Sequence, residues 1–219
     1  MIPRLRYFLA SPWAIAFTVL VSILLGIGSF PLFDVDEGAF SEASREMVET
    51  GNFAATWLDG EPRYDKPIFS YWMQAASISI FGHSEWAFRL PSALATIAWL
   101  VVLWRFGLAH LGRRRAIAAV LLLGNCLWVG LIGKAAIADA WLNLWLTLAL
   151  LDIYRYFEAD GERRSLALMV FLWMGLGFLT KGPVAVAIPL LVAIAFFVPE
   201  GRWRDLLRAG LDPAGIGIF

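Results

Sequence analysis

The sequence predicts an all-α protein, a multi-pass transmembrane helical bundle of about six spans. Two observations support this fold class. The chain of 219 residues is 60% hydrophobic and only 16% charged, a balance outside the range of soluble domains. Its apolar residues also fall into long runs separated by short charged segments. The formal net charge is zero, so nothing favours nucleic acid as a partner. Cys126 is the only cysteine, which excludes disulfides within the chain.

The first predicted span runs from Trp13 to Phe33. It holds about twenty apolar or small residues, enough for a helix to cross a hydrocarbon core of ~30 Å. A cleaved signal peptide is the alternative, but its apolar region covers only ~7–15 residues and ends at a small-x-small site. This run is longer and ends in Phe30-Pro31-Leu32-Phe33. We therefore expect an uncleaved first span.

A polar segment of residues 34–86 follows, with ten acidic residues against three basic ones. Within it, Gly38–Thr50 has apolar residues on one face and charged residues on the others, which predicts an amphipathic helix at the membrane surface. Gly51 is expected to end this helix. Pro67 suits the first turn of a second juxtamembrane helix, which Gly82 is expected to end. The sequence therefore predicts a structured first outer loop.

The later spans are read from apolar runs between charged segments. They are Trp86–Leu108, Ala116–Ile132, Ile137–Tyr154, Leu166–Leu179 and Val184–Val198. Gly201–Leu211 is an amphipathic basic segment, and Ala214–Phe219 resembles the beginning of a seventh span. We therefore expect one transmembrane domain over residues 1–219, truncated before a seventh span and any C-terminal domain.

The arginines predict the orientation, because short loops rich in Arg and Lys remain in the cytoplasm. Most arginines fall at alternate ends of the spans: Arg4, Arg6, Arg113, Arg114, Arg115, Arg155, Arg163, Arg164, Arg202, Arg204 and Arg208. The N-terminus is therefore expected in the cytoplasm and the acidic loop outside. The chain's three lysines, Lys66, Lys134 and Lys181, then all lie on the outer side. A lysine is a compact, movable charge that suits a phosphate.

Carboxylates on the same outer side are candidates for chemistry. Asp36 follows the first span, and Asp139 begins a later span with no base nearer than Lys134. A carboxylate can orient a hydroxyl or accept its proton, while cations hold a departing phosphate. Helix capping is the alternative for Asp139 and for the neighbouring Asp34, and snorkelling at a span end is the alternative for Lys134 and Lys181.

Several short motifs then carry a family resemblance. In chain order they are Asp36-Glu37, Ser44-Arg45-Glu46-Met47, Gly51-Asn52-Phe53, Arg63-Tyr64-Asp65-Lys66-Pro67 followed by Tyr71-Trp72, Ile137-Ala138-Asp139 and Thr180-Lys181-Gly182. This ordered set resembles the polyprenyl-phosphate-dependent glycosyltransferases of the membrane GT-C type, glycosyltransferase family 39. The nearest members are bacterial aminoarabinose transferases that modify lipid A and protein O-mannosyltransferases. The resemblance implies a bundle of GT-C type.

The resemblance also implies roles for single residues. The carboxylate after the first span, the catalytic acid of the family, corresponds to Asp36, and a second essential acid corresponds to Asp139. The expected substrate-binding residues, which include the lipid-phosphate site, are Glu37, Arg63, Asp65, Lys66 and Lys181. The chain departs from the aminoarabinose transferases at three positions, which carry Asp65, Phe40 and Pro183 where Glu, Tyr and Phe are usual.

The function that the resemblance implies is sugar transfer. The donor is a polyprenyl-phosphate-linked sugar, the acceptor is a lipid, a glycan or a protein, and the reaction takes place at the outer face of the cell inner membrane, among membrane lipids. No cofactor is required by the residues, although the acidic outer loop could hold a divalent cation. Two alternatives remain. A transporter or flippase of lipid-linked sugars predicts charges in mid-span, and an inactive membrane scaffold predicts that Asp36, Asp65 and Asp139 are replaceable.

Overall fold

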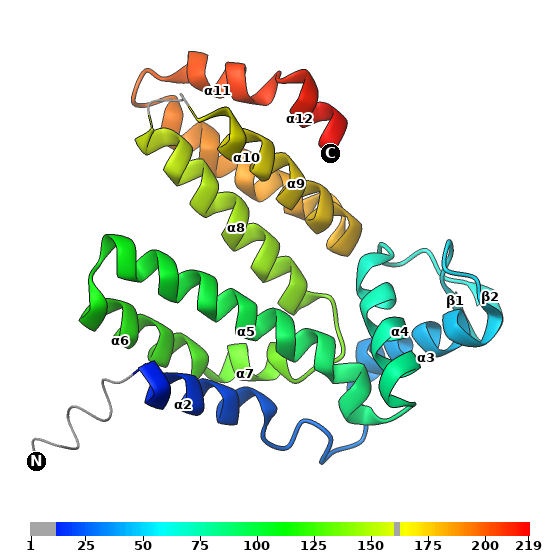
Figure 1. The fold of residues 1–219 in the computed structure, drawn as a ribbon. Helices are drawn as coiled ribbons and strands as arrows, with labels where there is room; N and C mark the ends of the chain where they lie inside the picture. The colour runs from blue at the N-terminus through cyan, green and yellow to red at the C-terminus, as the bar shows by residue number, and fades with distance from the viewer. Residues whose placement is uncertain (1–11, 160–162) are drawn as a thin grey trace, which may run out of the picture. The chain divides into compact units, whose positions relative to one another are not determined.

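The computed structural model describes residues 12–159 and 163–219, and the predicted Arg4 and Arg6 lie outside these ranges. The described chain is almost entirely helical, which confirms the predicted all-α class (Figure 1). Its helices are α2 (Pro12–Leu24), α3 (Asp34–Thr50), α4 (Phe69–Phe81), α5 (Glu85–His110), α6 (Arg113–Gly124), α7 (Leu127–Gly133), α8 (Asp139–Glu158), α9 (Arg164–Lys181), α10 (Val184–Phe197), α11 (Trp203–Gly210) and α12 (Pro213–Ile218). Its strands are β1 (Trp57–Leu58) and β2 (Glu61–Pro62).

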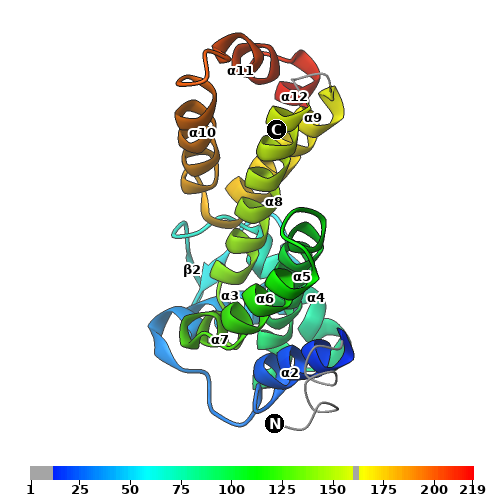
Figure 2. The ribbon, with the colours of Figure 1, turned by 90° about the vertical axis from the view of Figure 1, so that its left-hand side faces the viewer.

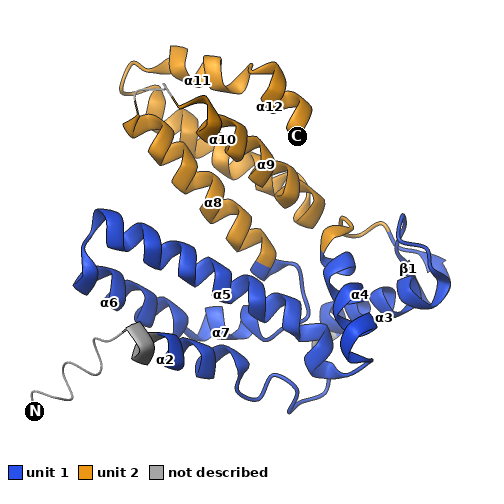
Figure 3. Ribbon diagram, in the orientation of Figure 1, with its two compact units in different colours: residues 1–63, 70–140 blue, residues 64–69, 141–219 orange. Residues whose placement is uncertain are grey.

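The described chain folds into two compact units (Figure 3). Unit 1 comprises residues 1–63 and 70–140, and unit 2 comprises residues 64–69 and 141–219. Each unit has an apolar core of its own. The prediction of a single transmembrane domain over residues 1–219 remains a prediction.

In unit 1, α2 packs against α5, α6 and α7, and α5 packs along α6. Their shared core is aliphatic: Val19, Ile23, Ala93, Leu100, Ile117 and Val120. Gly107 allows α5 and α6 to approach closely, since a Cβ at this position would lie 3.0 Å from Ala116 Cβ. Small residues at such crossings are typical of helices packed in membranes.

The part of the acidic loop that lies in unit 1 contains the predicted amphipathic helix. α3 begins at Asp34 rather than Gly38 and ends before Gly51, whose φ of 68° is the left-handed conformation that glycine adopts at helix ends. A short hairpin follows, in which Trp57 pairs with Pro62. No hairpin was predicted here, although an Asp-Gly pair signals such a turn. Asp59 and Gly60 have φ values of 54° and 76°.

In unit 2, α9 packs against α10 and α12, and α11 packs against α10 (Figure 2). The core between α8, α9 and α10 includes Ile153, Tyr156, Ala167, Ala193 and Phe197. α11 corresponds to the predicted amphipathic basic segment, and α12 to the predicted beginning of a seventh span.

Among the described helices, α5 and α9 are each long and apolar enough to cross a membrane. The predicted span over 116–132 contains a break, because α6 and α7 meet at a bend of 66°. The first predicted span is also not one helix to Phe33. α2 ends at Leu24, and Gly26 adopts a positive φ of 73°. The count of about six spans remains a prediction.

Candidate active site

Asp36 and Glu37 lie on the first turns of α3 and have opposite environments. The Asp36 side chain is exposed, whereas Glu37 is only 3% exposed. Successive residues on an α-helix point about 100° apart, because a turn takes about 3.6 residues. The helix therefore presents Asp36 outward while it buries Glu37. An exposed carboxylate is the one that can meet a substrate.

Glu37 forms a buried ion pair with Arg89, on α5 of the same unit. Arg89 Nε donates to Glu37 Oε1 at 2.7 Å, and Arg89 Nη2 donates to Oε2 at 2.9 Å. Burial raises the pKa of the Glu37 carboxyl, but the hydrogen bonds from Arg89 and from two backbone amides outweigh burial and leave the pKa below its ordinary value. Glu37 is therefore ionised at neutral pH, and its carboxylate is engaged in hydrogen bonds within the protein.

Arg89 was not singled out in the sequence, although a signal was present. It lies near the start of the apolar run from Trp86, and a charge inside such a run requires a partner. The structure supplies Glu37 and three backbone carbonyls. Arg89 Nη1 donates to Ile27 O at 2.9 Å and Phe30 O at 2.8 Å, and Nη2 donates to Pro31 O at 2.8 Å. Arg89 thereby binds the irregular segment that follows α2.

The link between α7 and α8, which leads to Asp139, is held by the same network. Ala136 N donates to Glu37 Oε1 at 2.8 Å. Gln74 Nε2 donates to Ala136 O, also at 2.8 Å. Asp139 is half-buried and forms the first residue of α8 three positions later. The structure thus ties the segment that bears Asp36 to the segment that bears Asp139.

Helix capping was the alternative role for Asp34 and Asp139, and the structure bears on the two residues differently. The residue that precedes α3 is Phe33, and its backbone amide donates to Glu37 Oε2 at 2.6 Å. The side chain of Asp34 lies outside the described part of the structure. Asp139 is in the first turn of α8, where an acid complements the helix dipole. A capping role for Asp139 therefore remains open beside the catalytic one.

Arg63, a predicted substrate-binding residue, is half-buried in unit 1 beside the hairpin. Its Nε donates to the hydroxyl of Tyr71 at 3.3 Å. Tyr71 is fully buried and stacks on Phe40 with ring centroids 4.8 Å apart. The ring of Phe40 therefore supports the Tyr71 side chain.

Unit 2 brings two of the predicted phosphate-binding segments together. Lys66 and Asp65 form a partly exposed ion pair, with Nζ 3.5 Å from Oδ1. The next residue, Pro67, lies against the turn after α9, because a Cβ placed on Gly182 would be 4.0 Å from Pro67 Cγ. Lys181, the last residue of α9, immediately precedes this turn. The Lys66-Pro67 and Lys181-Gly182 segments are therefore neighbours.

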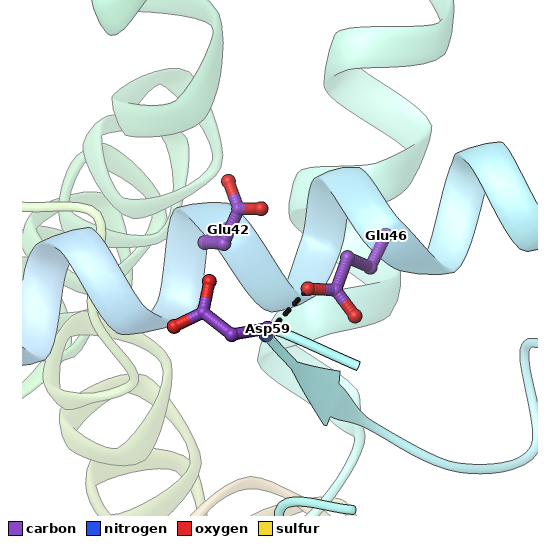
Figure 4. Close-up of side chains that lie close together, drawn as sticks. All are labelled: Glu42, Glu46 and Asp59. Atoms are coloured by element: carbon purple, nitrogen blue, oxygen red, sulfur yellow. Dashed lines mark hydrogen bonds between the residues drawn. The ribbon is translucent and has the colours of Figure 1, made fainter. Parts of the chain in front are cut away.

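The acidic residues Glu42, Glu46 and Asp59 form a cluster on α3 and the hairpin turn (Figure 4). Each offers a carboxylate oxygen, and these atoms lie within 4.8 Å of one another. Oxygen ligands suit Mg²⁺ or Ca²⁺. However, Glu42 pairs with Arg45 at 2.5 Å, and Glu46 accepts the Asp59 amide at 2.6 Å. A cation fits here only if it competes with Arg45, and the divalent cation in the acidic loop remains a prediction.

Comparison with known proteins gives a matching family and several relatives of this chain. Residues 65–211 match the family described as dolichyl-phosphate-mannose-protein mannosyltransferase. An undecaprenyl phosphate-alpha-4-amino-4-deoxy-L-arabinose arabinosyl transferase of Aeromonas salmonicida is 35% identical over 201 residues, which are 90% of this chain and 37% of the relative. The transferase of the same name from Yersinia pestis is 32% identical over 197 residues, 89% of this chain and 35% of the relative.

Two solved structures share the fold. ArnT from Cupriavidus metallidurans bound to undecaprenyl phosphate superposes with a TM-score of 0.83 at 24% identity, over 94% of this chain and 38% of that protein. The same protein in the apo state gives a TM-score of 0.79, over 94% of this chain and 39% of that protein. This chain spans a little over a third of the length of these relatives. The match supports the predicted bundle of GT-C type.

Proposed function

The chain belongs to the dolichyl-phosphate-mannose-protein mannosyltransferase family, and we propose that it serves a membrane glycosyltransferase. The donor in this proposal is a sugar linked to a polyprenyl phosphate, and the acceptor is a lipid, a glycan or a protein. The named relatives act with undecaprenyl-phosphate-linked aminoarabinose. A lipid-linked aminoarabinose is therefore the first donor to test.

The observation that carries the proposal is the proximity of the Lys66-Pro67 and Lys181-Gly182 segments in unit 2. A polyprenyl phosphate leaves the reaction as an anion, so its site must supply positive charge. Two lysines carried by neighbouring segments meet this requirement. Asp65 lies within 3.5 Å of Lys66 and holds that lysine in the absence of a phosphate.

Asp36 is proposed as the group that orients the acceptor hydroxyl or accepts its proton. Its side chain is exposed at the start of α3, so an acceptor can reach it. Asp139 is proposed as the second acid, and Arg63 as a further contact to the donor. Proton transfer by a positioned side chain contributes about 10²–10⁴-fold to a rate.

The proposed location is the inner membrane, with the N-terminus in the cytoplasm and the acidic loop outside. The distribution of arginines supports this orientation. A carrier phosphate would then sit at the outer headgroup level. Labelling of single cysteines introduced at Ser84 or Ser165, with Cys126 replaced by alanine, tests the orientation. Reaction of Ser165→Cys but not Ser84→Cys with an impermeant outside reagent would reverse it.

The experiment for the function itself uses the complete native protein in liposomes. Undecaprenyl-phosphate aminoarabinose and lipid A are supplied on one side, and products are identified by mass spectrometry. Transfer of the sugar to an acceptor, with release of undecaprenyl phosphate, is expected. Movement of intact lipid-linked sugar across the bilayer without cleavage would instead support the transporter alternative. Neither transfer nor movement with any donor would support the inactive scaffold.

A further inference from the structure

The link between α7 and α8 is irregular backbone, yet its buried polar groups are bound by side chains from three different helices. Glu37 of α3 accepts the amide of Ala136 at 2.8 Å, and Gln74 of α4 donates to the carbonyl of Ala136 at 2.8 Å. Ser92 of α5 donates to the carbonyl of Ile137 at 3.1 Å. Each bond crosses a long stretch of sequence. The link that leads to Asp139 is therefore fixed from outside rather than by its own hydrogen bonds.

The segment after α2 is fixed from the same centre. The guanidinium of Arg89 binds the carbonyls of Ile27, Phe30 and Pro31, and its remaining N–H groups bind Glu37. Glu37 also accepts the amide of Phe33 at the start of α3. Arg89 and Glu37 thus join two irregular segments to α3 and α5.

Both charged groups have no bonding capacity left over. An arginine side chain has five N–H donors, and all five of Arg89 are used. A carboxylate has about four acceptor positions, and Glu37 accepts four hydrogen bonds. The two residues are 5% and 3% exposed. Such a pair holds backbone in place, and it leaves no acceptor on Glu37 for a substrate.

We propose that Glu37 and Arg89, assisted by Gln74, form a positioning device that sets Asp36 and Asp139 relative to each other. The proposal rests on the proposed function and goes beyond it. It assigns Glu37 to holding the protein, in place of the substrate contact that the family resemblance implies. It also adds Arg89 and Gln74 to the residues on which turnover depends.

The physical reason is geometric. Catalytic groups lose much of their effect when they move by about 1 Å, and loops alone do not hold side chains to that precision. Asp36 directly precedes Glu37, and Asp139 follows Ala136 by three residues. A bond between Glu37 and Ala136 therefore transmits position from one acid to the other over a short stretch of chain.

The test uses the complete native protein in detergent and two readouts. The first is amide hydrogen exchange in peptides that cover residues 134–140, which reports local opening of this link. Glu37→Gln removes the charge that Arg89 and Ala136 N–H bind, so exchange there should rise by at least about tenfold. The matched control is Glu49→Gln. It lies on the same helix and pairs with Arg45, but its side chain is 51% exposed. Amide hydrogen exchange of residues 134–140 in Glu49→Gln should equal that in the parent protein.

The second readout is steady-state transfer. A positioning role predicts that Glu37→Gln lowers kcat by about tenfold or more while the KM for the donor stays within about threefold. Arg89→Lys keeps the charge but loses the planar fork, so it should lower kcat as well. Titration with bound carrier counts the active sites. A loss of folded protein lowers that count, but it changes neither the KM nor the kcat per active site.

Three results would overturn the proposal: unchanged exchange in Glu37→Gln, raised exchange with a normal kcat, or a raised KM with a normal kcat. The last would return Glu37 to the substrate. If Glu37→Gln does not fold, Gln74→Leu is used instead, since it removes one hydrogen bond to Ala136 and leaves the ion pair intact. Exchange and kcat like those of the parent in Gln74→Leu would also overturn the proposal. If the parent transfers no sugar but exchange responds as expected, the proposed function fails and the positioning device stands.

Discussion

Unit 1 joins its irregular segments through buried polar side chains, whereas unit 2 joins its helices through stacked aromatic rings. In unit 1, Glu37 and Arg89 bind backbone groups of two irregular segments, the one after α2 and the one between α7 and α8. In unit 2, Trp145 stacks on Trp141 at 5.6 Å and on Trp173 at 5.8 Å between ring centroids. Phe69 meets Trp141 and Trp145 edge-on.

The difference follows from the backbone that each unit must hold. A helix satisfies its own backbone groups, so aromatic packing is enough to join α8 to α9. An irregular segment at a membrane boundary leaves amides and carbonyls that need partners. Arg89 supplies several donors at once, which one neutral side chain cannot do. Polar side chains are thus placed where the chain is irregular, close to the candidate acids of unit 1.

Asp36→Asn should have the greatest effect on turnover, although it leaves the Glu37 network in place. If Asp36 acts as a base, turnover by the complete enzyme should fall by about 10²–10⁴-fold. Carrier binding should be unchanged, since it does not require this charge. If Asp36 has no catalytic role, turnover should instead match the parent, because Asn keeps the shape and hydrogen-bonding capacity of the side chain. Single-turnover transfer by the purified variant decides between them.

Lys66→Ala tests the chemistry of unit 2. Loss of one charged contact to a phosphate should weaken carrier binding by about 10–100-fold, because such hydrogen bonds contribute about 1.5–3 kcal/mol. Lys134→Ala is the matched control. The Nζ of Lys134 donates a hydrogen bond to Leu25 O at 2.8 Å within unit 1. The affinity of the variant for the carrier should therefore stay close to the parent value. Equilibrium binding of undecaprenyl phosphate measures both, and equal affinities for the two variants would contradict the assignment.

Trp145→Ala removes the ring that stacks on both Trp141 and Trp173 in unit 2. Its side chain is buried, and such truncations cost about 3–5 kcal/mol. The melting temperature in detergent should fall by several degrees, and exchange should rise in α8 and α9. Exchange in residues 134–140 should change little, because hydrogen bonds of unit 1 hold that link. A rise confined to residues 134–140 would show that the two units do not differ as described.

Acid should weaken unit 1 through Glu37, although less than these substitutions do. The folded pKa of Glu37 is lowered below 4.5. Its contribution to stability is therefore complete above about 4.5 and is lost as the pH falls through the lower folded value. Glu37→Gln should remove this part of the acid dependence. A melting profile of the variant that falls as steeply as that of the parent below pH 4.5 would contradict the prediction.

The smallest effect is expected for Glu49→Gln, which breaks the exposed pair with Arg45 and leaves Arg45 bound to Glu42. This exposed pair on α3 should contribute no more than about 0.5 kcal/mol, since solvent screens it. Turnover and melting temperature should match the parent. A fall in turnover comparable to that of Glu37→Gln would remove the distinction between exposed and buried pairs on α3.

Local signals in the sequence predicted much of the fold. Gly51 and Gly82 both follow the ends of helices, as expected, and both have positive φ. The breaks were harder to predict. α2 stops at Leu24 although the residues after it are apolar, and α6 ends before Asn125 inside an apolar run. Hydropathy reports whether a segment prefers lipid, but not whether its helix is continuous.

The sequence likewise predicted some residues of the candidate site but not their long-range contacts. Composition and motif order indicated Asp36, Asp139 and Lys66, which stand at the ends of predicted elements. The pairing of Glu37 with Arg89 was not predictable, because 52 residues separate them and neither has a local partner pattern. Nor could the sequence place Pro67 against Gly182. Long-range contacts of this kind depend on how the helices pack.

The most direct measurement of the central claim is cross-linking of the carrier to the complete native protein. An undecaprenyl phosphate with a diazirine in its first isoprene unit is bound, irradiated and mapped by mass spectrometry. Labels are expected in residues 64–69 and 180–184, the two neighbouring segments that carry Lys66 and Lys181, and these labels should be lost in Lys66→Ala. Specific labelling elsewhere in the chain, unaffected by Lys66→Ala, would show that the carrier phosphate does not bind at these two segments.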